Sequence, residues 1–150
     1  MKRKNLISTA TSAIGAIIGL IIHQLFLLYK YQLPVYFELV QKESYSGLKS
    51  EILLNMFFGS IKTALSLSLY VVPIIMLIIF FYGNFIYKKL HSLNKLNVAT
   101  FLGSAVFTSL LLTTLLTNRR LDTYFLCLSL AIFPTLFYWY AMAYQSRQNA

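Results

Sequence analysis

The sequence predicts an all-α polytopic membrane protein, a four-transmembrane-helix bundle with a candidate interfacial helix in the first loop. Of its 150 residues, 58% are hydrophobic and only 11% are charged, which is too little polar material to cover a water-soluble surface of that size. The mean hydropathy is +0.67. The apolar residues form four runs that approach or exceed the roughly 20 residues needed to cross a hydrocarbon core of about 30 Å.

These runs are predicted as helical spans at about 6–29, 63–87, 98–117 and 124–144, with a first loop at 30–62. They lack the alternation of a transmembrane strand, and backbone amides in lipid must be paired, so each is predicted to be a helix. The first run ends in bulky residues around His23 to Lys30 and lacks a small-residue cleavage site, so we interpret it as a span and not as a secretory signal. The expected organisation is a single membrane domain over 1–150.

The first loop is the one connection long enough to have structure of its own. Apolar residues recur there at helical spacing, which favours an interfacial helix over 47–61 that turns into span two near Gly59. The alternative is one long tilted second helix that begins near Ser50, with Lys62 reaching the membrane surface. The sequence leaves both open.

The distribution of basic residues predicts that both termini are cytoplasmic. The sequence has 13 Lys and Arg residues and a formal charge of +9, and most of them lie at the ends of the chain or between the apolar runs. This distribution is typical of topology determinants and contacts with anionic lipids, and it argues against nucleic-acid binding. The orientation depends mainly on the cluster ahead of span one, formed by Lys2, Arg3 and Lys4.

Span one carries a face of small and polar residues. Thr11, Gly15, Gly19 and His23 follow one another at four-residue intervals, so they lie on one side of the helix. Gly15 and Gly19 form a GxxxG motif, which lets another helix backbone approach closely. This face is predicted to contact either a helix of the same chain or a second copy.

A set of polar or helix-bending residues within the spans is the candidate for a polar pathway. His23 is an ionisable group at membrane depth, which is a functional hypothesis by default. Proline bends a helix and frees a backbone carbonyl, and serine and threonine hydroxyls can line a polar route, although they also bond to their own helix. The candidate pathway residues are His23, Gln24, Pro73, Ser104 and Thr108.

Catalytic chemistry is not predicted. The four acidic residues all lie outside the predicted spans, and the sequence has no nucleophile elbow, no zinc-protease motif and no phosphate-binding glycine loop. The lone Cys127 cannot form an internal disulfide, and His91 lies at the opposite side of the membrane from His23. We therefore expect no catalytic, cofactor-binding or metal-ligating residues, and no cofactor.

One segment carries a family resemblance. Residues 68–83, with Tyr70 and Pro73 in mid-helix and a closing Tyr-Gly, resemble the uncharacterised four-helix membrane proteins of bacilli and related bacteria of the UPF0715 type. The resemblance implies a multi-pass plasma-membrane protein with no established activity. It covers one span and the four-helix layout.

Together these observations predict a non-enzymatic accessory or interaction protein of the plasma membrane, such as a subunit of a membrane complex or an immunity-type protein. The alternative is a small oligomeric transporter or channel. Expected partners are the lipid bilayer and either further copies of the chain or another membrane protein.

Overall fold

The computed structural model describes residues 2–42, 49–89, 94–117 and 121–147, and this part of the chain is helical apart from Asn94. The elements are α1 (Lys2–Leu27), the π-turn η1 (Leu28–Gln32), α2 (Leu33–Lys42), α3 (Lys49–Lys89), α4 (Lys95–Thr117) and α5 (Leu121–Arg147). Four stretches are long and apolar enough to cross a membrane: Asn5–Gln41, Ser50–Ile86, Lys95–Thr113 and Asp122–Gln145. The predicted all-α fold with four membrane-spanning helices is confirmed.

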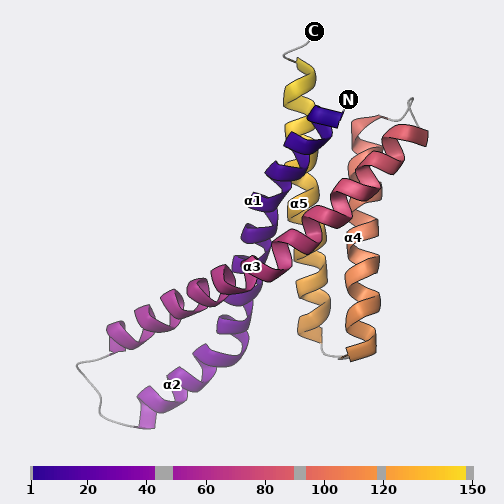
Figure 1. Ribbon diagram of the computed structural model, residues 1–150. Helices are drawn as coiled ribbons and strands as arrows, with labels where there is room; N and C mark the ends of the chain where they lie inside the picture. Colours follow the sequence, from indigo (N-terminus) through magenta and orange to yellow (C-terminus); the bar gives the residue numbers. More distant parts are fainter. Residues whose placement is uncertain (1, 43–48, 90–93, 118–120, 148–150) are drawn as a thin grey trace.

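The helices form a bundle in which α1 and α5 are the central pair. α1 packs along both α5 and α3, and α4 packs on α5 and, less extensively, on α3. Both ends of the described chain lie at the same end of the bundle, so α1 and α5 run antiparallel (Figure 1). In the most apolar 18-residue stretch of each spanning helix, 39% of the residues are buried in α1 and in α5, against 22% in α3 and in α4. The outer helices α3 and α4 therefore present more of their surface to lipid.

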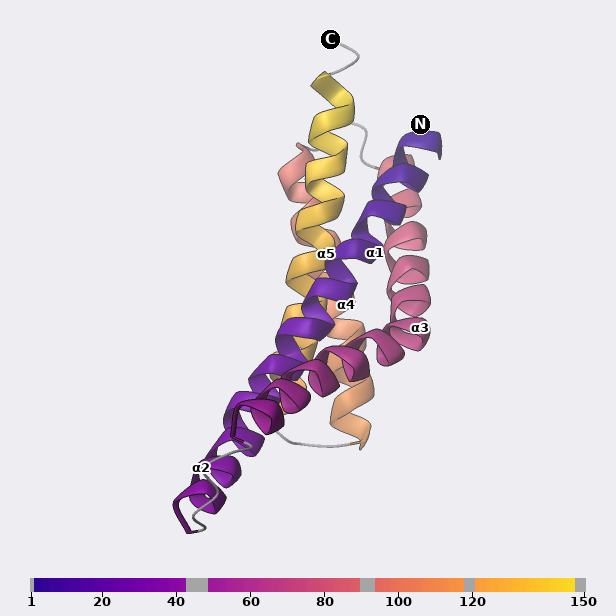
Figure 2. The ribbon, with the colours of Figure 1, turned by 90° about the vertical axis from the view of Figure 1, so that its left-hand side faces the viewer.

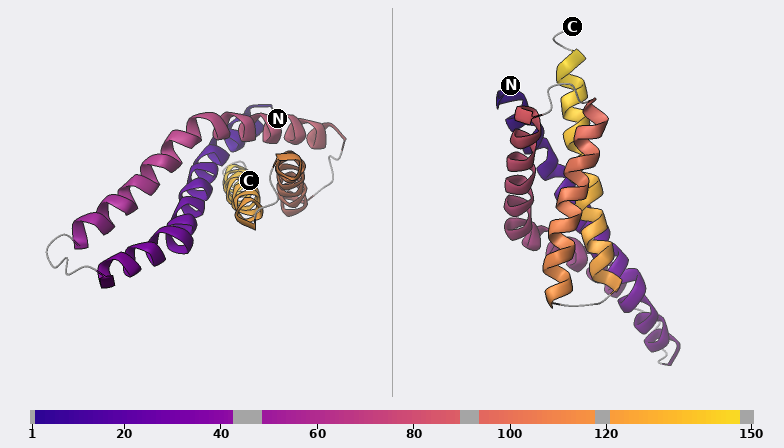
Figure 3. Two further views of the ribbon diagram at one scale, coloured as in Figure 1. Left: turned by 90° about the horizontal axis from the view of Figure 1, so that it is seen from below. Right: turned by 90° about the vertical axis from the view of Figure 1, so that its right-hand side faces the viewer.

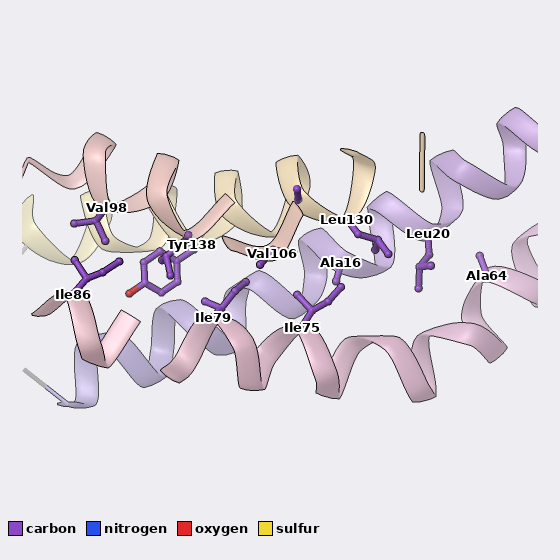
Figure 4. Close-up of a cluster of buried hydrophobic side chains, with 12 residues drawn as sticks. Ala16, Leu20, Ala64, Ile75, Ile79, Ile86, Val98, Val106, Leu130 and Tyr138 are labelled. Atoms are coloured by element: carbon purple, nitrogen blue, oxygen red, sulfur yellow. The ribbon is translucent and has the colours of Figure 1, made fainter. Parts of the chain in front are cut away.

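The core is a continuous layer of side chains from all four spanning helices (Figure 4). In lipid there is no hydrophobic effect between helices, so their association depends on close packing and on hydrogen bonds. Alanine and branched aliphatic side chains dominate the layer, and Tyr138 is its largest member. The buried cluster contains Ala16, Leu20, Ala64, Ile75, Ile79, Ile86, Val98, Leu102, Val106, Leu130, Ala131 and Tyr138.

The first connection is much shorter than the loop expected at 30–62. The first helix continues through η1 into α2, and the backbone N–H of Leu33 donates to the carbonyl of Leu28, one residue further back than in an α-helix. Pro34 follows directly, and a proline ring clashes with the carbonyl four residues earlier in a regular helix. The widened turn relieves this clash, so the helix continues instead of ending.

In the described residues α3 is one continuous helix from Lys49 to Lys89, as the second alternative for the first loop expected, while residues 47 and 48 of the expected interfacial helix lie outside the described residues. No separate interfacial helix breaks from it near Gly59. The helix contains Pro73 and changes direction sharply between its two halves (Figure 2).

Two helices therefore extend well beyond the bundle. A straight helix of 37 residues would be about 55 Å long at 1.5 Å per residue, well over the roughly 30 Å of a hydrocarbon core, and both long stretches turn away from the bundle, one at η1 and the other within α3 (Figures 1 and 2). The excess forms a projection, here called the arm, that consists of α2 and residues 49–59 of α3. Its two helical segments run out sideways from the bundle, on the half of the molecule away from the termini (Figures 1 and 3).

Candidate functional site

The small-residue face of α1 is covered by α5 of the same chain. A Cβ atom built on Gly15 would lie 2.4 Å from the carbonyl oxygen of Phe133 and 2.8 Å from Cα of Pro134. One built on Gly19 would lie 2.9 Å from the carbonyl oxygen of Ser129. Thr11 is half-buried, and its hydroxyl donates to the carbonyl of Ile7 in its own helix. The GxxxG motif thus lets the α1 and α5 backbones approach within the monomer.

His23, at the far end of the same face, is buried and holds the start of α5. Its Nε2 lies 3.2 Å from the carbonyl oxygen of Asp122, and since a carbonyl can only accept, Nε2 must carry the hydrogen. The imidazole also stacks on Phe125 with ring centroids 6.3 Å apart. His23 therefore fixes the position of the first turn of α5 against α1.

The side chain of Asp122 joins α5 to the π-turn. Its Oδ1 accepts from Lys30 Nζ at 2.7 Å, and its Oδ2 accepts from the Tyr31 hydroxyl. The Lys30 ammonium also lies 4.9 Å from the centre of the Tyr31 ring and 5.8 Å from that of Phe26, within the range of a cation–π contact. Two consecutive residues of η1 thus bind one carboxylate, where the bundle ends and the arm begins.

A cavity of about 780 Å³ opens at this junction. Its polar lining residues bear a cation, an anion, an imidazole, a phenol, an amide and a hydroxyl, and two leucines complete the wall. The lining residues are His23, Leu27, Lys30, Tyr31, Gln32, Asp122, Thr123 and Leu126. The volume lies within the range of small-molecule sites, and this cavity is the candidate functional site.

The sequence did not predict this site beyond His23. Lys30 and Asp122 both lie at the ends of predicted spans, where a charged residue is common and by itself does not indicate a binding site. Although Asp122 lies outside the predicted span, the start of α5 brings it beside His23, where both residues line the cavity. The predicted topology alone could have indicated this pair. Span one ends and span four begins on the same side of the membrane, which brings the opposite charges of Lys30 and Asp122 to that side.

A second polar cluster, also missed, ties three helices at the other end of the bundle. Asn5 Nδ2 donates to Asn84 Oδ1 at 3.0 Å, and the Tyr138 hydroxyl donates to Asn5 Oδ1. The side chain of Tyr138 is fully buried. Each group is satisfied inside the bundle, which indicates a structural role.

The other residues of the candidate polar pathway do not join His23. Pro73, Ser104 and Thr108 are exposed on the outside of the bundle, and Gln24 is half-buried. The hydroxyls of Ser104 and Thr108 donate to carbonyls of their own helix, those of Phe101 and Ser104. A single copy of the chain therefore does not assemble these residues into one route.

The chemistry of the cavity is suited to binding. The Asp122 carboxylate already accepts from two donors, and the lining contains no cysteine or serine that could act as a nucleophile. Within the described residues, no group of three or more His, Cys, Asp or Glu could hold a metal ion. The charged and amide groups of the lining can hold a polar ligand.

Fold and site together define a multi-pass helical membrane protein with a polar cavity at one end of its bundle and a projecting helical arm beside it. A scan against models of protein families, a search of curated proteins and a search of solved structures each returned no match to this chain. The resemblance to UPF0715-type proteins therefore stays a prediction.

Proposed function

We propose that this chain is a non-enzymatic interaction protein of the plasma membrane that binds another membrane protein through its arm. The arm is the observation that supports this proposal. From residue 50 to residue 59, no described position is buried. The exposed apolar side chains of the arm include Val35, Phe37, Leu39, Ile52, Leu53, Leu54, Phe57 and Phe58.

The exposed apolar side chains of the bundle face lipid tails, which cover them. The exposed apolar side chains of the arm are proposed to lack this cover. The two long helices exceed the length of a straight span and turn away from the bundle, and Glu38 and Glu51 are exposed on the part that turns away, so we place the arm at the membrane interface. A contiguous apolar surface outside the lipid tails is typical of a contact site. Glu38 and Glu51 can also contribute polar contacts at the rim of such a contact site.

The proposed orientation places both termini in the cytoplasm and the arm on the opposite side. Support comes from the bundle end that bears the termini. The starts of α1 and α4 and the end of α3 lie there (Figure 1), and with them the basic residues Lys2, Arg3, Lys4, Lys88, Lys89 and Lys95. Lys30, Lys42, Lys49 and Lys62 lie on the other side of the first span, so the total count of basic residues hardly differs between the two sides, and the orientation depends on the basic cluster ahead of α1.

Site-specific photocrosslinking in intact cells tests the arm. Benzoylphenylalanine at Phe58 is compared with the same probe at Phe81, since both phenylalanines lie in α3 with 60% and 66% of their surfaces exposed. We expect the Phe58 probe to give a discrete protein adduct and the Phe81 probe, in the membrane-spanning half, to label lipid alone.

The adduct must also depend on the arm surface. With the probe at Phe57, the neighbouring Phe58→Glu substitution is expected to abolish the protein adduct while the protein still reaches the membrane. Identical labelling from Phe58 and Phe81 would refute the proposal. An adduct of twice the chain mass would replace the partner protein with a second copy.

A further inference from the structure

We infer that the polar cavity binds a phosphoethanolamine group, that is, a phosphate joined to a primary ammonium, as carried by the headgroup of phosphatidylethanolamine. This inference is independent of the partner proposed for the arm. It depends on the depth of the cavity, on the charges in its wall and on the hydrogen-bonding capacity that these charges still have.

The cavity lies at headgroup depth. The apolar stretch of the first helix begins at Asn5, and about 20 residues cross the hydrocarbon core, so the core ends near Gln24 or Leu25. The α1 and η1 residues in the lining beyond this point are Leu27, Lys30, Tyr31 and Gln32. Asp122 is the first residue of the last spanning stretch and marks the same level on α5.

The wall carries both signs of charge, and each charge has bonding capacity left. Lys30 has three N–H donors, one of which bonds to Asp122 at 2.7 Å, and an ionised carboxylate has about four lone-pair sites for its two donors. The side chains of Gln32 and Thr123 line the same space. A purely anionic ligand would be repelled by the Asp122 carboxylate, and a purely cationic ligand would be repelled by the Lys30 ammonium. A zwitterion complements both charges.

The arrangement also orients the ligand. The Lys30 ammonium lines the cavity beside the first turn of α5, which begins at Leu121, and a cation next to the positive end of a helix dipole favours a phosphate. The ligand ammonium then donates to Asp122 and to the amide oxygen of Gln32. Leu27 and Leu126 form the apolar part of the wall, where the glycerol and the start of the acyl chains would lie.

The same geometry selects a primary ammonium over a quaternary one. Trimethylammonium groups have no N–H donor and are recognised by open aromatic faces. The rings of Phe26 and Tyr31 next to the cavity already face the Lys30 ammonium at 5.8 and 4.9 Å. Phosphatidylcholine is therefore expected to bind more weakly than phosphatidylethanolamine with the same acyl chains.

Native mass spectrometry of the full chain in detergent tests the inference, with phosphatidylethanolamine, phosphatidylcholine and phosphatidylglycerol of one acyl composition titrated separately. We expect phosphatidylethanolamine to bind at least tenfold more tightly than phosphatidylcholine. Lys30→Gln and Asp122→Asn should each remove this preference, and Lys62→Gln, at an exposed lysine away from the cavity, should keep it.

Two further experiments are needed. One separates a structural effect of a substitution from the loss of a ligand contact, and the other distinguishes the lipid from the free headgroup as the ligand. Gln32→Ala and Thr123→Val leave the ion pair of Lys30 and Asp122 intact and should still weaken phosphatidylethanolamine binding. Competition by free phosphoethanolamine would assign the site to the soluble group as well, whereas binding of the lipid alone would assign it to the bilayer. Equal affinities for the three lipids, or unchanged binding by all four cavity variants, would overturn the inference.

Discussion

The close approach of α1 and α5 makes the Gly15→Ala substitution a sharp test of the fold. The new Cβ would lie 2.4 Å from the Phe133 carbonyl oxygen, where ordinary contact begins at 3.4 Å, so the two helices must separate by about 1 Å (3.4 minus 2.4). The obstructing atoms belong to the α5 backbone and cannot rotate away. Overpacking of this kind costs about 1–3 kcal/mol, which is roughly a 5- to 150-fold change in the unfolding equilibrium.

Two other glycines provide a graded comparison. At Gly19 the nearest atom, the carbonyl oxygen of Ser129, is 2.9 Å away, and at Gly59 nothing lies within 4 Å. We expect Gly19→Ala to destabilise less than Gly15→Ala. Gly59→Ala should be neutral or stabilising by up to about 1 kcal/mol, because alanine is the better helix former.

The measurement is reversible unfolding in mixed micelles with increasing sodium dodecyl sulfate. It can be followed by far-ultraviolet circular dichroism and by the fluorescence of Trp139, the single tryptophan of the chain. If Gly15→Ala is as stable as Gly59→Ala, α1 and α5 do not approach through this face, and the bundle arrangement is wrong.

Two other perturbations test the polar contacts at the two ends of the bundle. Tyr138→Phe keeps the ring but removes the hydroxyl that donates to Asn5. A double-mutant cycle with Asn5→Ala in the same unfolding assay should give a coupling free energy of about 0.6–1.7 kcal/mol. A coupling of zero would contradict the hydrogen bond between Tyr138 and Asn5. Asp122→Asn removes the charge that holds Lys30 of the π-turn, so spin labels at Glu38 in α2 and Tyr140 in α5 should show a broader distance distribution. Glu51→Gln, at an exposed acid of the arm, is the control, and an unchanged width in Asp122→Asn would show that the arm is held by other contacts.

Much of the fold was predictable because membrane insertion depends on local properties of the chain. Apolar length and the absence of strand alternation are sufficient to predict four helices, and α4 at Lys95–Thr117 agrees with the run expected at 98–117 within a few residues. The first connection was not predicted correctly. A loop was expected at 30–62 because the residues there separate two apolar runs, but the π-helical turn at Leu28–Gln32 accommodates the ring of Pro34 within a continuing helix.

The candidate site was predictable only in part. His23 was conspicuous because an ionisable side chain at membrane depth is costly. Its partner Asp122 is 99 positions away in the sequence, and Lys30 and Tyr31 reach the same carboxylate across 92 and 91 positions. No periodicity within a helix connects residues at such separations, so only the pairing of α1 with α5 brings them together.

The sequence by itself determined that the chain is helical and apolar enough to cross a membrane four times, since hydropathy and backbone hydrogen bonding are satisfied span by span. It also determined that Gly15 and Gly19 allow a close helix contact. Only the tertiary structure decided that α5 fills this contact, that Asp122 meets Lys30 and Tyr31 beside His23, and that α2 and the start of α3 project as an arm. Lipid surrounds every span in the same way, so the choice of neighbour depends on shape and polar complementarity between distant segments, which no single span contains.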